Sequence, residues 1–199
     1  MSLSGSYLRA QFGALLLLHL GISTAFAQSK TFTVNPDQSE VAFSLGDVLH
    51  QVHGTFHIQN GNVPFDDRSP HLSGSIVVAA GSGKSGNNTR DRRMTVDILN
   101  APQFAEASFS PKQMIGSVAA AGDSAVQVVG VLMLHGTAHD LTVPMQIHID
   151  GKTCTAKTRF VIPYVKWGLK DPSTFLLRVD KEVEMEITLV GQLSATTLQ

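Results

Sequence analysis

The sequence predicts an all-β domain of about eight antiparallel strands with one short helix. Apolar and polar residues alternate with a period of two along most of the chain, as expected for strands that bury one face. One segment has a helical pattern, in which capping residues precede apolar residues spaced four apart. Strands with polar outer faces close either as a sandwich or as a barrel, and a barrel leaves no strand edge exposed.

The first 27 residues have the pattern of a secretory signal peptide. Arg9 precedes a short apolar run at residues 12–22, and Ala25 and Ala27 form a site for signal peptidase. The run is shorter than the roughly 20 apolar residues that a membrane span needs, which disfavours a membrane anchor. We therefore expect cleavage after Ala27, a single domain over residues 28–199, and a periplasmic or secreted protein.

Strands are predicted on both sides of a glycine-rich joint. The alternation places them at residues 31–34, 40–45, 52–58 and 72–79 before the joint, and at 108–118, 126–135, 143–149, 157–163 and 183–189 after it. In the last strand, the glutamates at 182, 184 and 186 face one way and apolar residues face the other. Strand 126–134 is apolar on both faces, so something must cover its outside, and the second subunit of a homodimer is one candidate.

One helix is predicted, over residues 89–99. Asn88 is expected to cap its N-terminus, and Asp91 has the spacing of a capping box. Met94 and Ile98 lie four residues apart and form the stripe that packs on the rest of the domain.

Charge and cysteine content narrow the class of protein. The net charge is −1 and no block of five or more Lys and Arg residues occurs, so the footprint of a nucleic-acid-binding protein is missing. Cys154 is the only cysteine, which excludes an intrachain disulfide. It shares a strand face with apolar residues, and we expect a buried, unreactive thiol.

The histidines do not have the spacing of a metal site. His53 and His57 share a strand face but lie roughly 13 Å apart. His135 and His139 flank a predicted hairpin turn without an evident third ligand. We expect surface histidines, no metal, no cofactor and no catalytic residue. Two alternatives remain open, a metal-dependent hydrolase that uses surface histidines and a ligand-free interaction module.

Four stretches, in this order, resemble the YceI-like family. They are residues 32–43 (FTVNPDQSEVAF), 86–94 (GNNTRDRRM), 104–109 (FAEASF) and 130–144 (GVLMLHGTAHDLTVP). The resemblance implies an eight-stranded antiparallel barrel of extended lipocalin type that holds a long polyisoprenoid and has no assigned catalytic activity. The chain departs from the family at Gln38, where a histidine is common, and at residues 160–173, a segment longer and more aromatic than the usual turn.

The inward-facing residues of such a barrel would line an apolar tunnel. An eight-stranded barrel can either fill with side chains or hold one small ligand, so a packed core is the alternative. The residues expected to contact a lipophilic ligand, a polyisoprenoid such as a quinone or a prenyl phosphate, are Phe43, Leu45, Val52, Phe56, Ile58, Met145, Ile147, Phe160, Ile162, Val183, Met185 and Ile187.

Arg90 and Arg93 are the candidates for binding a polar headgroup. They lie near the start of the predicted helix, where guanidinium groups and free backbone N–H groups both favour phosphate oxygens. The alternative is a solvent-exposed helix face on which Asp91 pairs locally with an arginine.

Overall fold

The computed structural model describes residues 29–46, 50–66, 68–175 and 177–196. The predicted signal peptide lies outside the described residues. Within these ranges, ten strands form one antiparallel sheet: β1 (Ser29–Val34), β2 (Glu40–Gly46), β3 (Gln51–Phe56), β4 (Ile58–Asp66), β5 (Ser75–Ala79), β6 (Glu106–Ile115), β7 (Gly122–Leu134), β8 (Thr137–Asp150), β9 (Thr153–Ile162) and β10 (Val183–Thr196).

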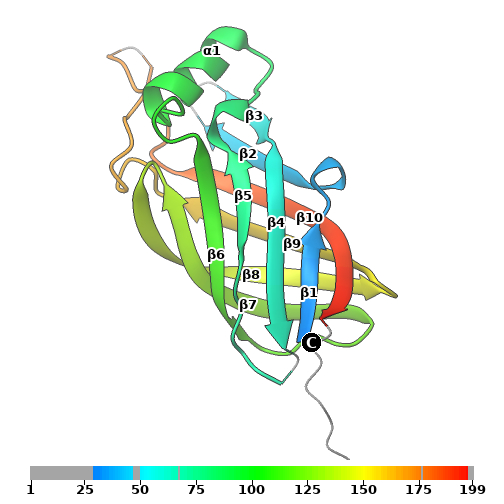
Figure 1. Ribbon diagram of the computed structural model, residues 1–199. Coiled ribbons are helices and arrows are strands. Elements are labelled where there is room, and N and C mark those ends of the chain that lie inside the picture. Colours follow the sequence, from blue (N-terminus) through cyan, green and yellow to red (C-terminus); the bar gives the residue numbers. More distant parts are fainter. Residues whose placement is uncertain (1–28, 47–49, 67, 176, 197–199) are drawn as a thin grey trace, which may run out of the picture.

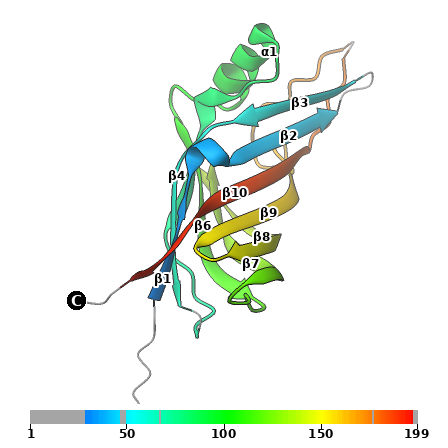
Figure 2. The same cartoon turned by 90° about the vertical axis from the view of Figure 1, so that its right-hand side faces the viewer.

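The sheet closes on itself because its first strand pairs with its last. The order β1-β4-β5-β6-β7-β8-β9-β10 returns to β1 through the ladder from Ser29↔Thr196 to Val34↔Gly191. These eight strands form a closed antiparallel barrel with one short helix at one end, here called the upper end (Figure 1). The predicted fold class is therefore confirmed. The hairpin of β2 and β3 extends the sheet beside the upper half of β10 (Figure 2).

One position in the barrel wall, beside β10, is shared by two strands. β1 pairs with residues 191–196 of β10 and β2 with residues 184–188, so β2 continues the path of β1. Between them, the hydroxyl of Ser39 accepts a hydrogen bond of 2.9 Å from the N–H of Val190, which replaces a missing ladder bond. The prediction of one strand over residues 52–58 is wrong, because the strand is interrupted at His57 and divides into β3 and β4. The N–H of His57 donates to the Ser82 hydroxyl at 2.8 Å instead of to a neighbouring strand.

The hairpin of β7 and β8 is longer than predicted. Its ladder runs from Gly122↔Ile149 to Leu134↔Thr137. The turn consists of His135 and Gly136, whose φ angles of 51° and 73° are those of a hairpin turn with two left-handed residues. The start of β8 was not predicted because residues 137–142 are mostly polar, and pairing with β7 rather than an apolar pattern makes them a strand.

The predicted helix is present, but its details differ. An α-helix α1 (Asn88–Arg92) continues directly into a π-helical turn η3 (Arg93–Ile98). The N-terminal cap is Asn87 rather than Asn88, and its side chain accepts the N–H of Arg90 at 3.0 Å. Asp91 does not complete a capping box. Its carboxylate accepts the N–H and the hydroxyl of Ser85 instead, which ties the glycine-rich segment to the helix.

The two faces of β7 have different surroundings. Val126 and Val128 are buried on the inner face, 5% and 4% exposed, within an apolar cluster that includes Val143. On the outer face, Val129 and Val131 are half-buried and Met133 is 38% exposed. The expectation that a second subunit covers this outer row stays a prediction.

The assignment of the faces of β7 can be tested by adjacent lysine substitutions. Val128→Lys should lower the free energy of unfolding by more than about 3 kcal/mol, because it places an unpaired ammonium group in an apolar interior. Gln127→Lys, on the exposed face next to it, should stay within about 0.5 kcal/mol of the parent. Equal midpoints of chemical denaturation for the two variants would mean that the faces are assigned wrongly.

The thiol of Cys154 should react slowly in the folded protein. The residue is 5% exposed, as the sequence predicted, and burial raises the pKa of its thiol to about 11. Both access and the fraction of reactive thiolate are therefore low at neutral pH. We expect a bulky thiol reagent to label unfolded protein promptly and native protein slowly, with a native rate that rises as the pH approaches 11. Rapid stoichiometric labelling of the native state at neutral pH would contradict this burial.

Candidate functional site: an apolar cavity in the barrel

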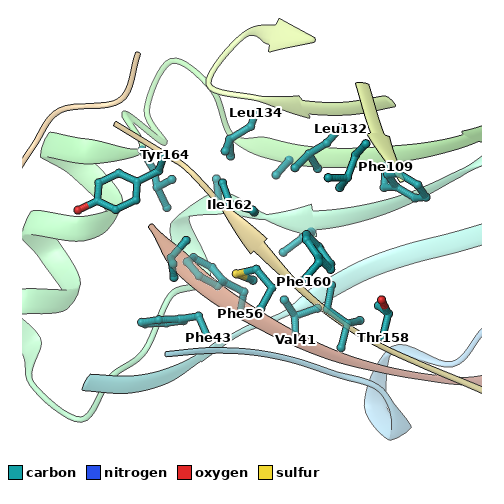
Figure 3. Close-up of a pocket in the computed structure, with 18 of the residues that line it drawn as sticks. Val41, Phe43, Phe56, Phe109, Leu132, Leu134, Thr158, Phe160, Ile162 and Tyr164 are labelled. Carbon is teal, nitrogen blue, oxygen red and sulfur yellow. The ribbon is translucent and has the colours of Figure 1, made fainter. Parts of the chain in front are cut away.

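A cavity of about 210 Å³ occupies the upper half of the barrel. Figure 3 shows aromatic and aliphatic side chains from several strands that project into this upper cavity, among them Phe43, Phe56 and Phe160. Nine of the residues predicted to contact a ligand line it: Phe43, Leu45, Phe56, Met145, Phe160, Ile162, Val183, Met185 and Ile187. The structure thus brings most of the predicted set around one space, and their role in binding stays a prediction.

The other three predicted residues lie elsewhere in the interior. Ile147 lines a second cavity of about 100 Å³ in the lower half of the barrel, here called the lower cavity. Ile58 is 1% exposed and belongs to the packed core. Val52 is half-buried against the same core, and neither Ile58 nor Val52 lines the upper cavity.

The upper end of the barrel is capped by two segments that the strand pattern did not reveal. Met94, Ile98 and Leu99 of the helical segment line the cavity from above. The π-helical turn, with the N–H of Leu99 bonded to the carbonyl of Met94 at 2.9 Å, brings these residues to the same side. Tyr164 and Leu169, from the long segment after β9, also line the cavity. The apolar pair Met94 and Ile98 was visible in the sequence, whereas residues 163–172 have no periodic pattern.

The cavity wall has two hydroxyl groups, and both are already bonded within the protein. The Thr158 hydroxyl donates to the carbonyl of Pro144 at 2.6 Å, and the Tyr164 hydroxyl donates to the carbonyl of Asp180 at 2.6 Å. Burial, together with the negative charges of Asp171 and Asp180, raises the pKa of Tyr164 to about 12, so the phenol stays neutral. The cavity therefore has room for a hydrocarbon but no free partner for a polar group.

The two candidate headgroup residues lie outside the upper cavity and contact different segments. Arg90 donates from Nε to the hydroxyl of Ser85 and from Nη2 to its carbonyl, each at 2.7 Å. Arg93 donates from Nη2 to the carbonyl of Pro172 at 3.1 Å, and Pro172 lines the cavity. The hydrogen bonds from Ser85 lower the pKa of the Asp91 carboxyl, against the opposing effect of burial. Arg93 thus lies at the rim of the cavity, and Arg90 fixes the segment before the helix.

The histidines have mixed environments. His53 shares a hydrogen bond with Ser44 at 2.8 Å, and His148 with Asp123 at 2.7 Å, both on the exposed surface. His139 differs from the expectation of a surface histidine. It stacks on Trp167, with ring centroids 4.0 Å apart and planes 6° apart, and its Nε2 is buried without a hydrogen-bond partner. No three His, Cys, Asp or Glu residues in the described part of the chain are grouped so that they could hold a metal ion.

In the described ranges, no helix is long and apolar enough to cross a membrane.

Comparison with known proteins identifies the family. No curated protein matches the sequence. Among solved structures, BcnA of Burkholderia cenocepacia is similar with a TM-score of 0.64 and 20% identity, covering 80% of this chain and 99% of that one.

Two further structures share the fold. A polyisoprenoid binding domain from Saccharophagus degradans has a TM-score of 0.63 and 12% identity, with 82% of this chain and 98% of that one covered. The YceI protein of Campylobacter jejuni has a TM-score of 0.58 and 16% identity, with coverage of 75% and 88%. The YceI-like domain description matches residues 32–191, which is most of the chain. The chain therefore belongs to the YceI-like family.

Proposed function

We propose that this protein binds and carries a lipophilic small molecule, a polyisoprenoid, with part of its hydrocarbon chain in the upper cavity. The observation that carries the proposal is a cavity of about 210 Å³ whose wall is apolar apart from two hydroxyls, both satisfied within the protein. Such a wall gains free energy from burying hydrocarbon, about 0.8 kcal/mol for each buried CH₂ group. The Saccharophagus degradans domain of the same fold, described as polyisoprenoid binding, supports this ligand class.

The same wall favours binding over catalysis. Reaction at a ligand atom would need an acid, a base or a nucleophile within hydrogen-bond reach of it. Thr158 and Tyr164 are the hydroxyl-bearing residues of the lining, and each donates its proton to a backbone carbonyl. We therefore propose a carrier and not an enzyme.

A polar headgroup is proposed to lie at the rim, near Arg90 and Arg93. A guanidinium has five N–H donors. Arg90 uses two of its nitrogens on Ser85, and Arg93 uses one on Pro172, so donors remain for a phosphate or a quinone carbonyl. Because Pro172 also lines the cavity, a chain that fills the cavity would have its polar end close to Arg93.

The proposed setting is the periplasm or the exterior of the cell. It rests on the signal-peptide pattern of residues 1–27 and cleavage after Ala27. A carrier in such a compartment would move a ligand that water dissolves poorly, which fits a binding site made of hydrocarbon side chains.

Filling the upper cavity should weaken ligand binding. Ala107 lines this cavity, and Ala107→Trp should weaken the binding of geraniol at least tenfold because the indole occupies the space of the chain. Glu106→Trp places the same group on the exposed face of β6 and should leave binding unchanged. Isothermal titration calorimetry measures the affinities of both variants. Mass spectrometry of an organic extract of the purified protein identifies any molecule that it carries. Equal affinities for the two variants would locate the ligand outside the barrel.

Replacing both arginines by alanine should separate headgroup binding from chain binding. Each charge-assisted contact to a phosphate oxygen contributes about 1.5–3 kcal/mol. The double variant Arg90→Ala, Arg93→Ala should therefore bind a prenyl diphosphate about a hundredfold more weakly or worse, and the matching prenyl alcohol nearly as well as the parent. Titrations at two salt concentrations give both affinities. Undiminished binding of the diphosphate would contradict the headgroup role, and the contacts of these arginines with Ser85 and Pro172 would be purely structural.

A further inference from the structure

Four side chains line both cavities of the barrel interior and lie between them. The upper and lower cavities share four lining residues, Ile76, Phe109, Met145 and Leu189, which we call the waist. They come from β5, β6, β8 and β10, so they are distributed around the barrel wall. A ligand in the upper cavity that extends downward must pass between these four side chains.

The upper cavity alone holds only a short chain. An engineered cavity of about 150 Å³ holds one benzene molecule. At the same carbon density, the upper cavity of about 210 Å³ holds roughly eight carbons, and the lower cavity of about 100 Å³ roughly four. With its first few carbons at the rim, a chain of about ten carbons fills the upper cavity, and one of about fifteen carbons also needs the lower cavity.

The members of the waist differ in how readily they can move. The ring of Phe109 packs over Gly130 of the neighbouring strand so closely that a Cβ at Gly130 would lie 2.6 Å from Cζ of the ring. Phe109 is therefore held against the wall. Met145 has an unbranched side chain that changes rotamer easily, and it is half-buried rather than fully enclosed. Met145 is the movable part of the waist.

We propose that the waist makes this carrier selective for chain length. A chain that fits the upper cavity binds without rearrangement, and a longer chain binds only when Met145 turns aside and opens the way to the lower cavity. This inference rests on the proposed function, because it assigns Met145 and Phe109 as specificity-determining residues of the same site.

The test compares two uncharged probes, geraniol and farnesol, which have the same headgroup and differ in chain length by one isoprene unit. Met145→Ala should raise the affinity for farnesol relative to geraniol at least tenfold, and Met145→Phe should lower that ratio by a similar factor. Phe109→Leu, which also widens the waist, should act in the same direction as Met145→Ala. Met185→Ala is the matched control, since Met185 lines only the upper cavity, and it should change both affinities alike.

Cys154 provides a readout of the lower cavity, whose wall it forms in part. In the parent protein, farnesol should slow the modification of Cys154 by methyl methanethiosulfonate at mildly alkaline pH, and geraniol should not. In Met145→Phe, neither probe should protect the thiol.

The outcomes separate the two proposals. If geraniol binds the parent, and the ratio of affinities is the same in Met145→Ala, Met145→Phe and the parent, the waist does not select chain length and the inference is overturned. Protection of Cys154 by geraniol would overturn it as well. If neither alcohol binds the parent protein, the proposed function itself fails.

Discussion

Closure of the sheet along β10 is the constraint on which the rest of the structure depends. β10 pairs with β9 from Val183 to Gln192, and on its other side with β1 and β2. Gly191 permits the close approach at this seam, because a Cβ there would lie 2.2 Å from the carbonyl oxygen of Thr33. Once closed, the barrel has no free strand edge at these eight positions, and its diameter is fixed by the number of strands. The space that side chains then fail to fill becomes the cavity.

A cavity of this kind recognises its ligand by shape and area. Hydrophobic burial is proportional to apolar area and has no direction, so the upper cavity distinguishes ligands by how much chain they can bury in it. In the proposed arrangement, directional contacts are made at the rim, where Arg93 donates to Pro172. Headgroup and chain would then contact separate parts of the molecule, and a substitution in one part should leave the contribution of the other largely intact.

The local period of two was sufficient to predict the strands and much of the lining, whereas the choice of a barrel over a sandwich came from the resemblance to the YceI-like family. Phe43, Phe160 and Met185 could be assigned to the interior from their own strands alone. The waist could not be predicted, because it depends on the register between strands, such as the pairing of Ile76 with Phe109. The contribution of residues 163–172 to the upper cavity was not predicted, for another reason. Residues 163–172 are held by individual contacts, including the hydrogen bond of Tyr164 to Asp180 and the stacking of Trp167 on His139, and such contacts have no periodic signature.

The volume of the upper cavity also bears on the stability of the fold. Cavities created in protein cores lower stability by about 24 cal/mol for each Å³. On that scale, the upper cavity of about 210 Å³ corresponds to roughly 5 kcal/mol, which is comparable to the whole stability of many domains. A hydrocarbon chain in the cavity would supply contacts that the wall lacks, so under the proposed function a bound ligand would raise the free energy of unfolding.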